Sequence, residues 1–466
     1  MPPVPAALAT RGAARDDARR RRELAVDVLV TLIWASAAVA VALYLATGVV
    51  ARMSSAADAV TALGAIAGLV ATDLVLVMLI LAARVPLVDR LVGHDRALAV
   101  HRSLGKPALY LLLAHGALVI VGYALADGLD PVTEAVTLLT TVPDIPTAFL
   151  AMALFVVIVV SSLVAVRGRL RYEVWHGIHL LTYAAVLVAL PHQLSVGSVF
   201  AEGSAQRAYW IGLYVLALGC LLVFRIGRPL VASLRHDLRV RSVEVVGDGV
   251  VSVHLAGRGL DRLRVQGGQF GIWRFWAPGT WWRAHPISFS SVPTSTDARI
   301  TVRALGRGTS RFAALAPGTR VLLEGPYGLF TERARTAPYL AVAAAGIGVT
   351  PVRSLLEHAQ FAPGELTVLL RASRPDERYL WDEVRQLTDA AGGTVLTDVG
   401  PRAASGASWL SADAVVRGLD LETVFPNLAD SDLYICGPAG WVSAVEAAAL
   451  SAGVAGHRIR VERFES

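Results

Sequence analysis

Six long apolar segments occupy the first half of the chain, and each is long enough for a helix that crosses a membrane. Their approximate ranges are 24–50, 59–83, 104–125, 146–166, 174–198 and 208–225. A transmembrane helix needs about 20 predominantly apolar residues. The pattern therefore predicts an all-α bundle of six transmembrane helices over residues 24–225.

Beyond residue 225 the period of the apolar positions changes. Short alternating runs, such as GVVSVHLAG and ARITVRAL, are separated by turn residues and predict an antiparallel β-barrel at 238–333. From residue 334 to residue 466, strand-like runs alternate with helical patterns, which predicts an α/β domain with a parallel sheet. The fold class is thus a multidomain membrane protein, with a linker at 226–237 and a disordered, basic cytoplasmic tail at 1–23.

Composition and charge agree with a membrane protein. Of the 466 residues, 55% are hydrophobic and 17% are charged, whereas a soluble globular domain is about 25% charged. Most of the net charge of +6 comes from arginines beside the apolar segments, which indicates contact with a lipid bilayer rather than with nucleic acid. Arginines gather in the tail and in the second and fourth connections, so both termini and the soluble domains are expected in the cytoplasm.

Four histidines lie in or beside two of the apolar segments, where ionisable side chains are costly and usually functional. His101 and His115 are fourteen residues apart, about 21 Å along a helix and within about 40° of one face. His179 and His192 are about 20 Å apart along a helix. Their directions differ by about 140° on an ideal helix, unless Pro191 bends it.

The charge pattern predicts that both segments run outward from the cytoplasm. His101 then matches His179 near the inner face, and His115 matches His192 nearer the outer face. Because imidazole is a good ligand for iron, two such pairs predict two haems, each with a histidine on both axial positions. His176, one turn before His179, is an alternative ligand, and hydrogen bonding between packed helices is the alternative role for all of them.

Short motifs in the soluble half have the pattern of cofactor-binding turns. AAGIGVTP at 344–351 follows a strand and opens a helix, where glycines let a dinucleotide phosphate approach the helix N-terminus. WRAHPISFSS at 282–291 lies between β runs, and YICGPAG at 434–440 ends a strand. For AAGIGVTP the alternative is a tight strand–helix turn without a ligand.

In this order, the histidine pairs, HPIS, GIGVTP and CGP resemble the ferric reductase and NADPH oxidase superfamily of bacterial type. In that family a six-helix haem-binding bundle is fused to a ferredoxin-reductase-type FAD and NAD(P) module. The resemblance covers about residues 24–466. It implies a multi-pass oxidoreductase of the cell membrane whose cofactors are FAD, two b-type haems and NADPH, with NADH as the alternative.

The resemblance also assigns residues to the cofactors. At the flavin these are His285, Pro286, Ile287, Ser288, Arg303, Gly306 and Thr309; at the nicotinamide nucleotide they are Gly346, Gly348, Thr350, Pro351, Arg371, Arg374, Cys436, Gly437 and Pro438. Ile287 stands where the family usually has an aromatic residue that stacks on the flavin. Cys436, Ser288 and Phe464 are the candidates for catalysis, Phe464 as a cover for the flavin ring. Arg371 and Arg374 lie where a 2′-phosphate could be bound, which favours NADPH; solvated surface arginines are the alternative.

The function implied is electron transfer from cytoplasmic NADPH through FAD and two bis-histidine haems to an outer acceptor, a ferric chelate or dioxygen. FAD stands between the other two because nicotinamide gives two electrons and iron takes one. One alternative is a membrane-anchored, haem-free flavin reductase of the ferredoxin-reductase type with a cytoplasmic acceptor. Another is a transporter regulated by the nucleotide module, although we expect its spans to lack the acidic residues of a proton relay. The sequence leaves the acceptor and the oligomeric state open.

Overall fold

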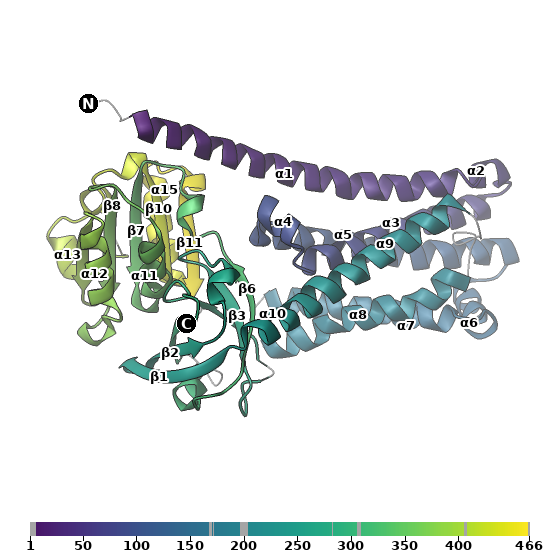
Figure 1. Ribbon diagram of the computed structural model, residues 1–466. Coiled ribbons are helices and arrows are strands. Elements are labelled where there is room, and N and C mark those ends of the chain that lie inside the picture. Colours follow the sequence, from purple (N-terminus) through teal and green to yellow (C-terminus); the bar gives the residue numbers. More distant parts are fainter. Residues whose placement is uncertain are drawn as a thin grey trace. The chain divides into compact units, whose positions relative to one another are not determined.

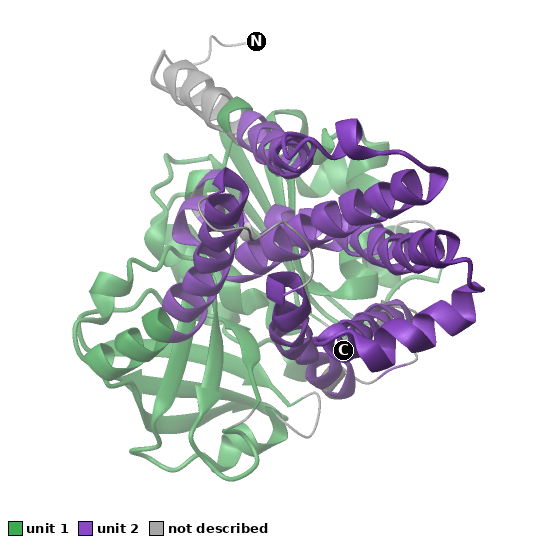
Figure 2. Ribbon diagram, turned by 90° about the vertical axis from the view of Figure 1, so that its right-hand side faces the viewer, with its two compact units in different colours: residues 1–21, 227–466 green, residues 22–226 purple. Residues whose placement is uncertain are grey.

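The chain forms two compact units, coloured separately in Figure 2. The computed structural model describes residues 6–166, 170, 172–195, 204–281, 283–304, 309–404 and 408–464. One unit comprises residues 22–226, and the other comprises residues 1–21 and 227–466. The change of period near residue 225 therefore coincides with the division of the chain into units.

Within the described residues, six helices are long and apolar enough to cross a membrane. These segments are Glu23–Leu45, Ala56–Ala82, Arg96–Asp127, Ile145–Val164, Val174–Ser195 and Ala205–His236. They belong to α1 (Ala6–Leu45), α3 (Ala56–Ala82), α5 (His94–Asp127), α7 (Ile145–Val166), α8 (Tyr172–Ser195) and α9 (Ala205–Cys220) with its continuation (Figure 1). The predicted six-helix transmembrane bundle is confirmed.

Several boundaries differ from the prediction. Helix α1 begins at Ala6, so the expected disordered tail is helical from there, because alanine and arginine are strong helix formers. Helix α9 continues through a π-helical turn, Leu221–Gly227, into α10 (Arg228–His236), which occupies the expected linker. Three further helices lie in connections between spans: α2 (Val49–Arg52), α4 (Pro86–Leu91) and α6 (Pro131–Thr141).

Two antiparallel three-stranded sheets form the β domain of the soluble unit. One has the order β1-β2-β5, with β1 (Arg239–Gly247), β2 (Val250–Ala256) and β5 (Asp297–Arg303). The other has the order β4-β3-β6, with β4 (His285–Ser288), β3 (Phe270–Phe275) and β6 (Val321–Tyr327). Alternate residues of β3 are buried, as a strand with one face in the core requires. The aromatic side chains of Trp273, Phe275, Phe289 and Phe312 fill this core. The predicted antiparallel β domain is confirmed.

A five-stranded parallel sheet forms the last domain, as predicted. Its order is β11-β10-β7-β8-β9, with β7 (Tyr339–Ala345), β8 (Leu366–Ala372), β9 (Thr394–Val399), β10 (Ser431–Pro438) and β11 (Ile459–Phe464). Its helices are α11 (Val349–His358), α12 (Trp381–Ala390), α13 (Ala412–Val416), α14 (Leu421–Val424) and α15 (Ala439–Ser451). The strand order reverses between β7 and β10, and open α/β sheets bind ligands beyond the carboxyl ends of the strands at such a switch point.

An ion-pair network joins the β domain to the α/β domain. Glu383 on α12 accepts hydrogen bonds from Arg299 on β5, at 2.7 Å, and from Arg353 on α11, at 2.8 Å. Burial alone would raise the pKa of Glu383, but the hydrogen bonds and charges of these two arginines lower it. The carboxylate is therefore ionised at neutral pH and holds both arginines.

Candidate functional site

The structure brings two of the four predicted histidines together. His101 on α5 and His179 on α8 have ring centroids 6.2 Å apart and ring planes inclined by 69°. Nδ1 of His101 lies 3.1 Å from the carbonyl oxygen of Met78 on α3, so Nδ1 carries the proton and Nε2 keeps its lone pair. Trp175 stacks on His179 with ring centroids 5.3 Å apart, and the ring of His176, the residue after Trp175, lies 6.3 Å from the Trp175 ring.

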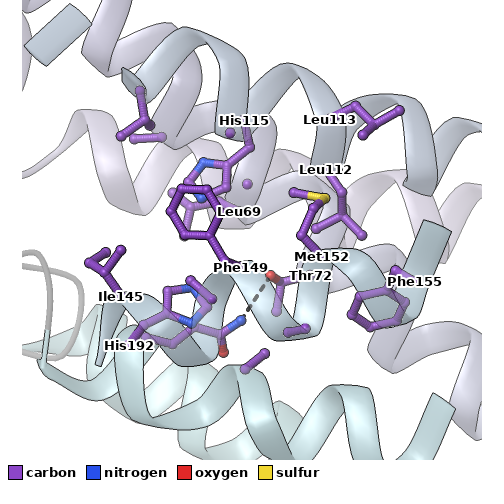
Figure 3. Close-up of a pocket in the computed structure, with 18 of the residues that line it drawn as sticks. Leu69, Thr72, Leu112, Leu113, His115, Ile145, Phe149, Met152, Phe155 and His192 are labelled. Atoms are coloured by element: carbon purple, nitrogen blue, oxygen red, sulfur yellow. Dashed lines mark hydrogen bonds between the residues drawn. The ribbon is translucent and has the colours of Figure 1, made fainter. Parts of the chain in front are cut away.

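The other two histidines line one cavity of about 670 Å³ (Figure 3). His115 and His192 point into it from opposite sides. Nδ1 of His115 lies 2.9 Å from the carbonyl oxygen of Gly64 on α3, as His101 does with Met78. A Cβ atom at Gly68 would lie 2.6 Å from the same Nδ1, so a glycine is needed beside the ring.

Most of the cavity wall is apolar. Leu69, Leu112, Phe149, Met152 and Phe155 contribute apolar surface. Three polar side chains of the wall are hydrogen-bonded in a row: the Tyr214 hydroxyl donates to Gln193 Oε1, and Gln193 Nε2 donates to Thr72 Oγ1 at 3.4 Å. The cavity suits a large, mainly apolar cofactor that can be bound by a histidine nitrogen from each of two opposite sides.

A buried acidic residue contradicts the expectation that the spans lack such groups. Asp73, inside the second predicted span, is completely buried in α3. Its Oδ1 accepts hydrogen bonds from Ser36 Oγ at 2.8 Å and from the Tyr209 hydroxyl at 2.6 Å. A single carboxyl group barely changes the hydropathy of a 27-residue helix, so the apolar pattern did not reveal it.

At the predicted flavin site, Ser288 lies beside residues that the sequence analysis missed. Ser288 Oγ lies 3.5 Å from Oε2 of Glu462 on β11. Ser288 pairs with Phe270 on the neighbouring strand, and Phe270 pairs in turn with Tyr327, with ring centroids 5.9 Å apart. The aromatic residue before the last glycine of EGPYG was the available signal for Tyr327. Nothing in the local sequence pointed to Glu462, which is 174 residues from Ser288.

His285 and Ile287 on β4 have different surroundings. Burial, with a smaller effect from the charges of Arg283 and Arg274, lowers the pKa of His285 to about 4, so the ring is neutral. Its Nε2 is buried and has no hydrogen-bond partner among the described residues, which fits a polar group of a cofactor. Ile287 is 8% exposed and packs in the β-domain core, while Pro286 is exposed.

Of the three residues predicted at the flavin pyrophosphate, two are described. Arg303 Nη2 lies 3.3 Å from Oε1 of Glu377 in the α/β domain, so the guanidinium of Arg303 has an ion-pair partner within the protein. Thr309 begins a 3₁₀ turn, Thr309–Ala314. Gly306 lies outside the described residues.

The two motifs predicted for the nicotinamide nucleotide meet at the switch point of the parallel sheet. Gly346 has a positive φ of 54°, and a Cβ atom at Gly348 would lie 2.2 Å from the carbonyl oxygen of Cys436. The backbone of GIGVTP can therefore approach the end of β10 only because Gly348 has no side chain. Thr350 and Pro351 are buried in the first turn of α11, and Thr350 Oγ1 has no partner among the described residues.

Cys436 lies in the buried part of β10 and is itself completely buried. Burial, with a smaller effect from the charge of Glu462, raises the pKa of its thiol well above the usual value, so the thiol stays protonated. Gly437 and Pro438 follow it, and Pro438 pairs with Phe464 on β11, which is half-buried. CGP and the predicted aromatic cover therefore lie on adjacent strands.

The two arginines predicted at a 2′-phosphate differ in accessibility. Arg371 is 2% exposed, its Nε lies 3.1 Å from Asp398 Oδ2, and its Nη2 donates to the Gly400 carbonyl at 2.6 Å. These contacts use its guanidinium inside the domain. Arg374 is exposed, and Asp376 is its ion-pair partner at 3.1 Å. Arg374 is thus the one of the two that can reach a ligand from the surface.

Comparison with known proteins agrees with this division of the chain. Residues 67–190 match the family described as "Ferric reductase like transmembrane component", and residues 342–447 match the "Oxidoreductase NAD-binding domain". The chain joins a ferric reductase-like transmembrane domain to a ferredoxin-reductase-type NAD-binding domain. The chain is therefore a ferric reductase-like fusion.

The ferric reductase-like fusion is similar to curated reductases over about half of its length. It is 30% identical over 212 residues to the ferredoxin–NAD(+) reductase component of the alkene monooxygenase system of Xanthobacter autotrophicus, covering 44% of this chain and 62% of that protein. It is 26% identical over 270 residues to a ferredoxin–NAD(P)(+) reductase component from a Ralstonia species, covering 54% and 78%. The FAD/NAD-binding domain of nitric oxide dioxygenase from Vibrio cholerae superposes with a TM-score of 0.40 and 22% identity, covering 50% of this chain and 100% of that domain.

Proposed function

We propose that this protein carries electrons from NADPH through FAD and two haems to an acceptor on the outer face of the cell membrane, a ferric chelate or dioxygen. The observation that carries the haem assignment is the distance of 6.2 Å between the ring centroids of His101 and His179. Metal–imidazole bonds are about 2.0 Å long, so two imidazoles on opposite sides of one metal ion have centroids about 6 Å apart. His101 and His179 would therefore be the residues that hold one iron between them.

The number of ligands also favours a macrocycle. Among the described residues, no group of three or more histidine, cysteine or carboxylate side chains could hold a metal ion. Two imidazoles per site suit a metal whose other ligands come from a porphyrin. The carbonyl oxygens of Met78 and Gly64 on α3 hold Nδ1 of His101 and His115 on α5, which would leave Nε2 for the metal.

In the soluble unit, the chain's own residues would orient the two redox cofactors. The N-terminus of α11 and the Thr350 hydroxyl would receive the dinucleotide phosphates, because the first backbone N–H groups of a helix have no partner within it. We assign the 2′-phosphate to Arg374. Ser288 and Glu462 would flank the flavin ring where nicotinamide approaches, beside the neutral thiol of Cys436. FAD accepts a hydride and passes its electrons on one at a time.

The distribution of arginines supports the direction of transfer. Arginine-rich connections favour the cytoplasmic side, which would place the soluble unit and the His101–His179 level there. A negative-inside membrane potential helps outward movement of an electron by about 2.3 kcal/mol per 100 mV.

The second candidate is a haem-free flavin reductase that is anchored in the membrane and reduces a cytoplasmic carrier. The names of the two curated relatives, both ferredoxin reductase components, favour it. The two candidates differ in one observable property, because only the first contains haem.

The test is an absorption spectrum of the full chain purified in detergent, recorded before and after addition of NADPH. We expect two haems per chain, reduced through the flavin. His101→Leu and His115→Leu should each lose one haem, while His176→Leu, one turn from His179, should keep both. A preparation with flavin absorbance and no Soret band refutes the haem assignment and supports the second candidate.

A further inference from the structure

The buried carboxyl group of Asp73 has no role in the electron path described above. It is 0% exposed, and three helices meet at it: α3 carries Asp73, α1 supplies Ser36 and α9 supplies Tyr209. Its Oδ1 has two hydroxyl neighbours, whereas its Oδ2 is buried without a hydrogen-bond partner among the described residues. Ionisable groups inside a membrane are costly and usually functional.

The hydrogen bonds around Asp73 can accommodate a charged or a neutral carboxyl group. When the group is ionised, the hydroxyls of Ser36 and Tyr209 both donate to Oδ1. When it is protonated, the Tyr209 hydroxyl has another acceptor, the Ser36 carbonyl oxygen at 3.0 Å, and Ser36 Oγ lies 2.9 Å away. Rotation of two hydroxyl groups is therefore enough to change between the two states, and no heavy atom has to move.

No fixed positive charge balances the carboxylate. Among the described residues Asp73 forms no ion pair, and Tyr209 is the titratable group that contacts it. Along the helices that contact α3, the next titratable groups are Asp27 and Tyr44 on α1, and Arg207 and Tyr214 on α9; on α5, Lys106 and Tyr110 lie between His101 and His115 and are exposed. Two hydroxyl donors and no cation among the described residues thus face this carboxyl group, so its protonation responds to a charge placed in the bundle.

Asp73 also lies between the two histidine levels. Met78, which holds His101, is five residues away on α3, about 7.5 Å along the helix axis. Gly64, which holds His115, is nine residues away in the other direction, about 13.5 Å. A charge at Asp73 therefore changes the electrostatic potential at both histidines of α5, His101 and His115.

We propose that Asp73 is a proton-binding site whose occupancy follows the electrons in the bundle, an inference that rests on the proposed function. An electron arriving from the flavin adds one negative charge, and one proton from water then binds the Asp73 carboxylate. When the electron leaves for the acceptor, the proton is released, so charge balances and no covalent product forms. At about 10 Å and an effective dielectric constant of about 20, one charge changes the proton affinity roughly tenfold.

The test combines redox titration with infrared difference spectroscopy on the full chain in lipid nanodiscs, reduced with dithionite. In the wild type, reduction should increase a carboxylic-acid band, and at least one midpoint potential should change with pH by about 59 mV, the equivalent of the tenfold shift. Asp73→Asn should lose both effects. Glu134→Gln, on α6, removes another buried carboxyl group that has an oxygen without a hydrogen-bond partner among the described residues, and it should keep both effects.

Tyr209→Phe gives a second measurement if Asp73→Asn does not fold. It keeps the carboxyl group but removes one donor to the ionised form, so the pH-dependent range should move to higher pH. An Asp73→Asn protein with both haems and an unchanged band overturns this inference alone. A wild-type preparation without haem overturns the proposed function and, with it, the coupling to electrons.

Discussion

Replacement of Gly68 by alanine should selectively damage the His115 level of the bundle. A Cβ atom at this position would lie 2.6 Å from Nδ1 of His115, and also within 3.0 Å of two ring carbons. The imidazole cannot rotate away freely, because Nδ1 is hydrogen-bonded to the Gly64 carbonyl at 2.9 Å. The methyl group of Gly68→Ala and the His115 ring therefore cannot both occupy these positions.

The structure gives the size of the effect. Ordinary contact begins at 3.4 Å, so the ring must move by about 0.8 Å, which takes the hydrogen bond beyond its normal length. Overpacking costs about 1–3 kcal/mol, and loss of the hydrogen bond costs about 0.5–1.5 kcal/mol. Alanine in place of glycine returns about 0.5–1 kcal/mol of helix stability. We expect a net destabilisation of about 1–3 kcal/mol and loss of the haem at His115.

Haem content and thermal unfolding of the purified protein measure the two consequences separately. Gly116→Ala is the matched control, because a Cβ atom at Gly116, which lines the same cavity, would meet only Met152 Cε at 3.5 Å. That variant should keep both haems and gain slightly in stability. If Gly68→Ala matches the control in haem content and in melting temperature, the close approach of helix and ring is not what positions His115.

Two further predictions concern the soluble unit. Gly348→Ala should raise the KM for NADPH at least tenfold without changing the FAD content, because its Cβ atom would collide with the Cys436 carbonyl oxygen. Gly440→Ala is the control, since a Cβ atom there meets nothing within 4 Å, and it should leave the KM unchanged. Equal KM values for the two variants would show that the missing side chain of Gly348 is not needed for NADPH binding. Arginine partners lower the pKa of Glu383 below its ordinary 4.5, so its contribution to stability is complete above that pH and is lost as the pH falls through the lowered value. Unfolding measured against pH should show Glu383→Gln less stable than the wild type at neutral pH, with a difference that disappears in acid; a difference that grows in acid would contradict the assignment.

The parts of the fold with a strong local signal were predictable from the sequence. Six apolar segments of membrane-spanning length needed no tertiary information, and histidines such as His101 and His115 stood out because ionisable groups are rare in such segments. GIGVTP was recognisable because a strand, a glycine turn and a helix follow in order. Each of these features depends on a stretch of fewer than about 30 residues.

Features that depend on distant partners were not predictable in the same way. The role of Asp73 is visible only once α1 and α9 supply Ser36 and Tyr209, which are 173 residues apart. Arg371 looked available for a phosphate, but Asp398 on the adjacent strand binds it inside the domain. Helix α6 is short and lies between two spans, so its pattern was lost beside the stronger ones.

One helix, α3, holds both histidines of α5 through backbone carbonyl oxygens, at Met78 and at Gly64. Backbone oxygens move with their helix and cannot adjust independently as a side chain would. If a thinner bilayer tilts α3 and slides it along α5, the hydrogen bonds to His101 and His115 both lengthen. Membrane thickness would therefore act on the positions of His101 and His115 together.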